Sequence, residues 1–413
     1  MRPAAPAPTV TVVVPVHRDS PAFRRALAAV TRLDPPADEV VVAVDGPDDA
    51  LAAVALEHGA RVVQLARGQG PAVARNAAAR AARGDVLFFV DADVVVRPDT
   101  VGLVRDHLAR HPGVSAVIGT YDDEPADPGF FSQYKNLLNH HVHQTARLEG
   151  STFWGACGAV RREAFEAVRG FDPRYSRPTV EDIELGYRLT DRGAQVHVVK
   201  ALQVKHLKRW TARTLLRSDV RDRALPWSAL ILRTGRMPDD LNTDLRGRVA
   251  VTLTGLACAG LAAAPAVPAA RVLVPAALAG VVATDWPLLR FLARHRGLPF
   301  AAGSAAWHVL HHAYSGGAFG VAVAHQVTGT PVWRYRAWCQ RRERRRARAE
   351  GTGAGALVPA GAGVPRGLVA AHRHVPAGQR PVRVPVGVLE LEPAPRPDVV
   401  DLVAAPRAER VLA

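Results

Sequence analysis

Cysteine is scarce in this sequence, with three residues, Cys157, Cys258 and Cys339, in a chain of 413. None of them forms a CxxC pair, and their wide separation argues against a disulfide framework or a structural zinc site. A reducing, cytosolic setting fits this composition best. The first residues, MRPAAPAPTV, also lack the apolar core of a signal peptide, so we expect the N-terminal domain to stay in the cytoplasm.

Acidic residues are also comparatively few: 38 Asp and Glu stand against 53 Lys and Arg, which leaves a net charge of +15. Such a charge favours anionic partners, whether nucleic acid, acidic lipid headgroups or phosphorylated ligands. The arginine-rich segment 341–348 could bind nucleic acid by charge alone. No recognition fold accompanies it, so we expect no nucleic-acid partner and interpret the segment as a tail at a membrane edge.

Strand-like and helical segments alternate over the first hundred residues. The expected strands are 9–16, 39–44, 61–65 and 85–90, and the expected helices are 21–31 and 71–83. This alternation predicts an α/β fold with a mainly parallel sheet and right-handed crossovers. Three further helices are expected at 130–150, 161–168 and 180–192.

Long apolar runs are confined to the C-terminal half. Residues 249–270 carry no charge and would form a helix of roughly 33 Å, enough to cross a bilayer, and 272–289 is a second candidate. Arginines follow the second run, which favours a hairpin with both ends in the cytoplasm. Residues 300–323 would be a third helix or, as we prefer, an interfacial or re-entrant one. The prolines inside these segments keep a soluble helical domain open as the alternative.

Two pairs of acidic residues are the candidate catalytic groups. Asp91-Ala92-Asp93 follows the strand 85–90, at the sheet edge where open α/β folds bind ligands. Two carboxylates in one turn offer oxygen ligands to a hard divalent cation, which would neutralise a departing diphosphate; the alternative is a solvated turn. Glu181-Asp182 opens a predicted helix, where one carboxylate could be a general base. The alternative there is a charge favoured by the helix dipole.

Seven motifs, in this order and spacing, resemble glycosyltransferase family 2 over about residues 9–215. They are VPVHRD (14–19), VAVDG (42–46), GPAVARNAA (70–78), GDVLFFVDAD (84–93), GACGAVRREAF (155–165), GFD (170–172) and VEDIELGYRL (180–189). The resemblance implies a GT-A fold and a metal-assisted, inverting transfer of sugar from a UDP-, GDP- or dTDP-linked donor. Mg2+ or Mn2+ is the implied cofactor. Together with the apolar runs, the resemblance indicates a membrane-anchored subgroup with C-terminal transmembrane helices.

The resemblance also implies roles for individual residues. Donor-binding positions are Pro15, Val16, His17, Asp45, Gly70, Arg75, Asn76, Asp91, Ala92, Arg209 and Trp210. A pocket shared by donor and acceptor would be lined by Trp154, Gly155, Ala156 and Cys157. Asp93, with Asp91 and His206, would hold the metal, and Asp182 would be the base with Glu181 beside it. An aromatic residue often stands at the position of His17, so the identity of the nucleotide base stays open.

The resemblance, the distribution of charge and the apolar runs together predict five parts of the chain. They are a flexible N-terminus (1–8), a GT-A catalytic domain (9–204), a basic amphipathic connector at the membrane surface (205–248), a membrane region (249–325) and a basic, largely disordered tail (326–413). We therefore expect a multi-pass protein of the cell membrane with a cytoplasmic catalytic domain.

The motif HLKRW at 206–210 has the Arg-Trp of processive polysaccharide synthases, but His206 replaces their usual glutamine. Too few helices follow to build a translocation channel, so we predict transfer of a single sugar to a lipid or membrane-associated hydroxyl. A polyprenyl-phosphate acceptor, or a non-catalytic membrane scaffold that binds nucleotide-sugar, are the alternatives. Cys157 could be a nucleophile, although a small buried residue is the simpler interpretation. Likewise His140, His141 and His143 are expected to be packed or solvated rather than zinc ligands.

Overall fold

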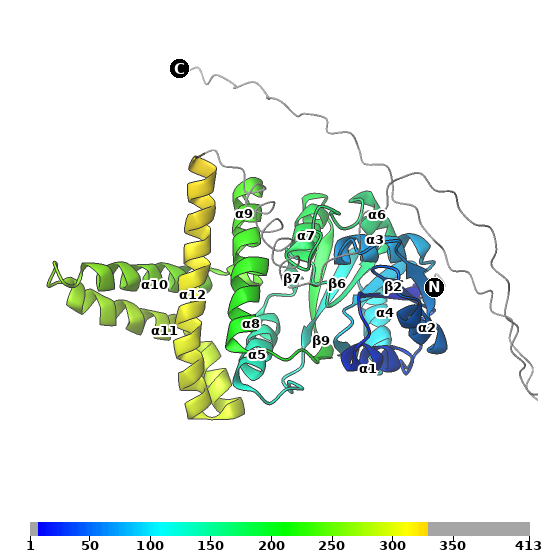
Figure 1. Ribbon diagram of the computed structural model, residues 1–413, viewed down its shortest axis with the longest axis horizontal. Helices are drawn as coiled ribbons and strands as arrows, with labels where there is room; N and C mark the ends of the chain where they lie inside the picture. The colour runs from blue at the N-terminus through cyan, green and yellow to red at the C-terminus, as the bar shows by residue number, and fades with distance from the viewer. Residues whose placement is uncertain (1–6, 329–413) are drawn as a thin grey trace, which may run out of the picture.

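The computed structural model describes residues 7–328. Figure 1 shows an N-terminal α/β part, a group of helices beside it, and a helical hairpin that projects away on the far side of one long helix. From residue 329 on, the expected tail, including 341–348 and Cys339, lies outside the described residues, as do the first six residues.

One mixed sheet of nine strands forms the centre of the α/β part. Its order is β3-β2-β1-β4-β8-β6-β9-β5, and β7 pairs with β9. The strands are β1 (Val10–Val16), β2 (Glu39–Val44), β3 (Arg61–Gln64), β4 (Val86–Val90), β5 (Val94–Val96), β6 (Val114–Tyr121), β7 (Glu149–Gly150), β8 (Cys157–Arg161) and β9 (Gln195–His206). The strands β3, β2, β1 and β4 are parallel, whereas β8 runs antiparallel to both its neighbours. This is the helix-flanked GT-A architecture, so the predicted fold class is confirmed.

Helices cover both faces of this sheet. They are α1 (Pro21–Val30), α2 (Asp49–Glu57), α3 (Pro71–Ala81), α4 (Thr100–Arg110), α5 (Phe130–Thr145), α6 (Arg162–Ala167) and α7 (Glu181–Asp191). Local chemistry explains several of their starts: the Ser20 hydroxyl accepts a hydrogen bond from the backbone of Phe23, and Pro21 occupies the first turn. The predicted helix 130–150 ends earlier, at Thr145, because residues 149–150 pair with β9.

The core lies where the parallel strands meet the helices. All five residues of β4 are buried, as are six of the seven residues of β1. Phe89 on β4 meets Phe153, Phe165 and Phe171 with ring centroids 5.1–6.1 Å apart. Strands that are buried on both faces consist of continuous apolar residues, which is why these strands could be predicted from the sequence.

The segment 205–248 folds against the α/β part. Strand β9 extends to His206 and is followed by α8 (Ala212–Arg217), the π-helical segment η1 (Ser218–Ala224), α9 (Leu225–Thr234) and the short helix η2 (Leu241–Thr243). Lys135 on α5 donates to Asp219 on η1 at 2.7 Å, and Trp227 on α9 donates to the Tyr187 hydroxyl at 3.2 Å. These contacts attach η1 and α9 to the domain that precedes them.

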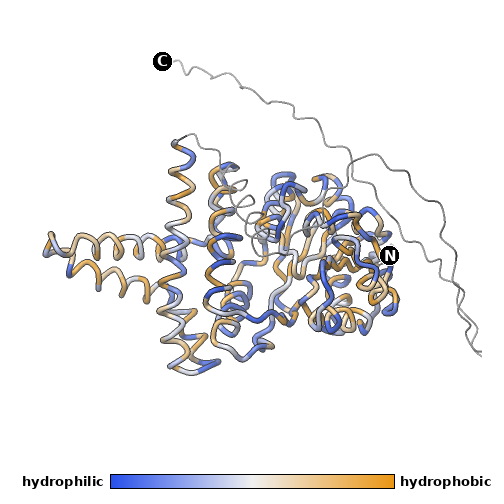
Figure 2. The backbone as a smooth tube through the Cα atoms, viewed as in Figure 1, coloured by the Kyte–Doolittle hydropathy of each residue, from blue (hydrophilic) through white to orange (hydrophobic). Residues whose placement is uncertain are grey.

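Between residues 7 and 328, two helices are long and apolar enough to cross a membrane, α10 (Leu245–Ala263) and α11 (Ala270–Arg296). Only 22% of the apolar window of each is buried, and Figure 2 shows that their projecting hairpin is largely hydrophobic. They begin and end at positions different from the expected 249–270 and 272–289. The segment expected at 300–323 is one continuous helix, α12 (Leu298–Val327), which contacts α9, η1 and the hairpin.

Candidate active site

A buried arginine joins the two acidic motifs. Arg75 on α3, which is 4% exposed, donates to Asp91 at 2.6 Å and to Glu181 at 3.0 Å. Glu181 is equally buried, and its second oxygen accepts from the backbone N–H of Thr179 at 2.7 Å. The end of β4 and the start of α7, about ninety residues apart in sequence, are therefore held within reach of one guanidinium group.

Asp182 lies beside this bridge. One of its oxygens accepts from the backbone N–H of Gly155 at 3.0 Å, and the other from Ile183 at 2.8 Å. Burial and, after it, the charge of Glu181 raise the pKa of Asp182, while the Gly155 hydrogen bond and Arg223 lower it, and the net result is a pKa of about 6. A carboxylate with a pKa near neutrality is suited to accept a proton at physiological pH.

Asp93 faces the end of β9. Its carboxylate lies 3.6 Å from Nε2 of His206, and that imidazole stacks on Tyr121 with centroids 4.4 Å apart and an angle of 5° between the rings. Burial alone would raise the pKa of Asp93, but His206 and Lys208 lower it below its usual value. An ionised carboxylate and an imidazole so close together are a donor pair that a divalent ion accepts.

The glycine-containing loop before α3 is held by Asp45, at the end of β2. Both oxygens of Asp45 accept backbone hydrogen bonds, from Gln69 at 2.7 Å and from Gly70 at 2.9 Å. Gly70 has φ +96°, and a Cβ there would come within 2.3 Å of the Ser176 carbonyl oxygen, so only glycine fits. Asp45 therefore fixes the backbone conformation of this loop.

Pro15 and Val16 end β1 at the same sheet edge, next to β2, and the exposed His17 follows them. Asn76, in contrast, has its side chain engaged elsewhere. Its amide donates to the Phe171 carbonyl at 2.7 Å and its oxygen accepts from the Phe171 N–H at 2.9 Å. Asn76 thus anchors the GFD loop, a structural role that the sequence did not indicate.

The four predicted pocket residues, Trp154 to Cys157, are all buried. Trp154 packs edge-on against Tyr121 and His143, while Gly155 lies so close to Arg75 that a Cβ would be 3.3 Å from its guanidinium. Ala156 and Cys157 are buried, and burial raises the pKa of the Cys157 thiol far above its usual range. A buried, protonated thiol is a poor nucleophile, which favours the small-core-residue interpretation of Cys157.

Histidines of α5 are packed residues. His140 and His143 direct their Nδ1 atoms to the carbonyls of Tyr121 and Gly119, both at 2.8 Å. Of the pair in the HLKRW motif, Arg209 is exposed and lies 3.7 Å from Asp127, whereas Trp210 packs against an apolar cluster that includes Tyr134 and Leu137 of α5. Lys208 lies 4.2 Å above the Trp210 ring, within the electrostatic reach of Asp91 and Asp93.

Arg223 and Tyr121 also lie at this site, and neither was predicted from the sequence to be a site residue. Arg223 comes from η1, and although partial loss of water lowers the pKa of its guanidinium, the carboxylates of Asp182 and Asp219 raise it above the usual value. Its exposed side chain thus adds positive charge within electrostatic reach of Asp182. No local signal could single it out, because it is one of eleven lysines and arginines between 205 and 248.

Two protein-family models match the part of the chain that carries this site. Residues 11–169 match the model of glycosyl transferase family 2, and residues 138–211 match that of the N-terminal domain of galactosyltransferase. The N-terminal part of the chain is therefore similar to glycosyl transferase family 2, and we call it the family 2 domain after this similarity. Asp91, Asp93 and Asp182 lie within the part that the two models cover.

The family 2 domain is also similar to curated proteins. It is 29% identical over 228 residues to validoxylamine A glucosyltransferase of Streptomyces hygroscopicus subsp. limoneus, covering 46% of this chain and 50% of the relative. It is 27% identical over 218 residues to the pre-mycofactocin glycosyltransferase of Mycobacterium tuberculosis, covering 49% of this chain and 45% of the relative. The chain spans about half the length of the curated relatives it matches.

Among solved structures, a mannosyltransferase from Pyrobaculum calidifontis in complex with GDP-Man and Mn2+ is 20% identical, with a TM-score of 0.47. The similarity covers 78% of this chain and 87% of that one. A mycobacterial protein is 24% identical with a TM-score of 0.41, over 55% of this chain and 75% of that one.

Proposed function

We propose that this protein transfers a single sugar from a nucleotide-sugar to a lipid or membrane-associated hydroxyl, with inversion at the anomeric carbon. The observation that carries the proposal is the double contact of Arg75 with Asp91 and Glu181. It supports the proposal because it ties the turn after β4, which holds Asp91 and Asp93, to the start of α7, where the pKa of Asp182 is raised to about 6. The named relatives are a glucosyltransferase and a glycosyltransferase, which supports the reaction class.

Asp182 is the proposed general base. In an inverting transfer the acceptor hydroxyl attacks from the side opposite the leaving diphosphate and must lose its proton to a nearby base. The Gly155 N–H and Arg223 favour the ionised form of Asp182, while burial keeps its affinity for a proton high. Glu181, paired with Arg75, positions this carboxylate rather than accepting the proton itself.

Asp93, Asp91 and His206 would hold the divalent ion, Mg2+ or Mn2+. Carboxylate oxygens and an imidazole nitrogen are ligands that such an ion accepts. The Asp93 carboxylate and Nε2 of His206 lie 3.6 Å apart, and Asp91 binds Arg75 through its Oδ1 atom. When bound, the ion would neutralise the diphosphate that leaves with the nucleotide. Lys208 and Arg223 add positive charge on the same side of the domain, as their mutual electrostatic influence indicates.

The helices α10 and α11 support a membrane-associated acceptor. They form an apolar hairpin with Arg246 and Arg248 at its start and Arg290, Arg294 and Arg296 near its end, which favours both ends on the cytoplasmic side. A catalytic domain attached to that side would meet acceptors at the membrane surface.

The donor and acceptor can be identified with membranes that contain the full chain. Incubation with a panel of UDP-, GDP- and dTDP-linked labelled sugars should place label in one lipid fraction, one sugar per acceptor. Label in long polymer would contradict transfer of a single sugar. No label with any donor, despite donor binding, would favour the scaffold alternative.

The base assignment is tested by Asp182→Asn, with Asp191→Asn at the exposed end of the same helix as the matched control. Loss of a general base should reduce kcat by about 100-fold or more, with donor affinity retained. The control should keep full turnover. If Asp182→Asn lowers the rate only slightly, the acceptor is a phosphate, which hardly needs a base, or the base lies elsewhere.

A further inference from the structure

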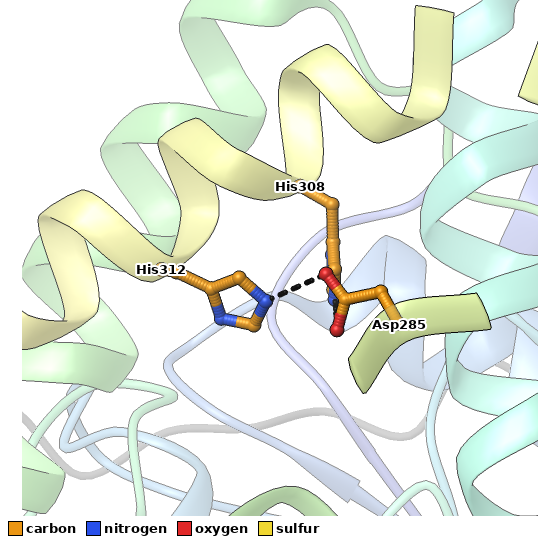
Figure 3. Close-up of side chains that lie close together, drawn as sticks. All are labelled: Asp285, His308 and His312. Carbon is orange, nitrogen blue, oxygen red and sulfur yellow. Dashed lines mark hydrogen bonds and ion pairs between the residues drawn. The ribbon is translucent and has the colours of Figure 1, made fainter. Parts of the chain in front are cut away.

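A second cluster of metal-binding side chains lies outside the catalytic domain, between α11 and α12. Asp285 comes from α11, and His308 and His312 come from successive turns of α12 (Figure 3). One ligand atom from each residue lies within 4.8 Å of the others. Both histidines are buried, and the side chain of Asp285 is 13% exposed. None of these residues belongs to the family 2 domain or to its motifs.

We propose that these three residues bind a divalent transition-metal ion of the Zn2+ class, with water at the fourth position. Two imidazoles and one carboxylate are a donor set that zinc accepts, and histidines four residues apart on a helix present their rings on one face. A hard ion such as Mg2+ prefers oxygen ligands and is poorly matched to this set.

The distances fit such an ion with little movement. Zinc bonds of about 2.0–2.1 Å in a tetrahedral arrangement hold ligand atoms roughly 3.3 Å apart. Nε2 of His312 lies 3.0 Å from Asp285 Oδ2, and Nε2 of His308 lies 3.9 Å from Asp285 Oδ1. These two separations run to different oxygens of Asp285 and lie on either side of the tetrahedral value, and the ligand atoms of all three residues lie within 4.8 Å of one another, so binding needs only a local adjustment of the side chains.

Tyr134 supplies the outer contact that metal-binding histidines commonly make. Its hydroxyl lies 2.5 Å from Nδ1 of His308. With the Nδ1 proton directed to that hydroxyl oxygen, Nε2 of His308 keeps its lone pair for a metal, as in other histidine metal sites. Tyr134 is fully buried on α5, so the site links the hairpin and α12 to the family 2 domain.

A neighbouring network is distinct from this site. His311, whose ring stacks on that of His308 with centroids 5.2 Å apart, directs Nδ1 to the Tyr314 hydroxyl at 2.6 Å, and Tyr314 donates to Asp219 at 2.7 Å. Asp219 also accepts from Lys135 at 2.7 Å, which balances its charge. That network is satisfied internally, whereas Asp285 pairs with the two proposed histidine ligands, His308 and His312.

The test uses the full chain in detergent, carrying Asp93→Asn so that the proposed catalytic ion does not contribute. After chelation and dialysis against Zn2+ in excess Mg2+, elemental analysis should find one tightly held zinc ion per chain. Co2+ in its place should give the visible absorption of a tetrahedral nitrogen–oxygen site. Added Zn2+ should raise the thermal unfolding midpoint, because it binds only the folded state.

His312→Ala, and separately Asp285→Asn, should abolish the zinc content, the cobalt spectrum and the zinc-dependent shift. His295→Gln, on the last turn of α11, is the control and should retain all three. Asp285→Asn keeps the shape of the side chain, so a folded variant is available even if His312→Ala unfolds. Retention of zinc in the folded Asp285→Asn and His312→Ala chains, or no zinc in the parent chain, would overturn the proposal. Turnover is not the readout, so failure here leaves the proposed transferase function untouched.

Discussion

Replacing Arg75 with glutamine should destabilise the family 2 domain strongly. The change leaves Glu181, which is 3% exposed, as a buried carboxylate without its ion-pair partner. It also releases Asp91, whose side chain is 34% exposed and can be partly solvated instead. Most of the loss in the free energy of unfolding should therefore come from Glu181.

Breaking a buried ion pair by removing one partner typically costs about 3–5 kcal/mol. For a domain of this size each kcal/mol lowers the unfolding midpoint by roughly 2–4 °C, so a fall of about 6–20 °C is expected. Removing the stranded charge as well, in Arg75→Gln with Glu181→Gln, should recover part of that loss, because a neutral amide costs less to bury than a carboxylate.

The matched control is Arg24→Gln. Arg24 pairs with Asp19 at 2.6 Å, the same distance as Arg75 and Asp91, but both side chains of that pair are about half exposed. Thermal unfolding of the full chain in detergent should show little change for Arg24→Gln, because water screens exposed pairs. Equal midpoints for Arg24→Gln and Arg75→Gln, or no recovery in the double variant, would refute the reasoning.

Three further outcomes are expected. The value of kcat/KM should fall about tenfold per pH unit below about pH 6, where Asp182 becomes protonated. Arg223→Gln should move this acidic limb of the profile to higher pH, because it removes a charge that lowers the Asp182 pKa. An acidic limb that Arg223→Gln does not move would contradict the assignment. Gly70→Ala should weaken donor binding measured by calorimetry, since its Cβ would clash with Ser176, whereas Gly193→Ala, with positive φ but open space, should not. Chelation should abolish turnover measured with labelled donor, and Mg2+ or Mn2+ should restore it; full activity after chelation would remove the metal from the proposal.

Local pattern determined the N-terminal architecture. The strands β1, β2 and β4 are apolar runs buried on both faces, and each is followed by turn residues, so their positions and the location of Asp91 and Asp93 could be predicted within a residue or two. The apolar character of the hairpin was equally visible, although the ends of α10 and α11 were not, because helix ends depend on packing and capping.

Only the tertiary structure decided which charges meet. Arg75 is an ordinary helical arginine in the sequence, and its contact with Glu181 spans 106 residues. Arg223 was hidden in a basic segment that looked like a membrane-facing connector, and Asp285 looked like a single charge at the end of an apolar run. Periodicity reports which face of an element is apolar, whereas the partner of a buried charge is set by contacts between elements distant in the chain.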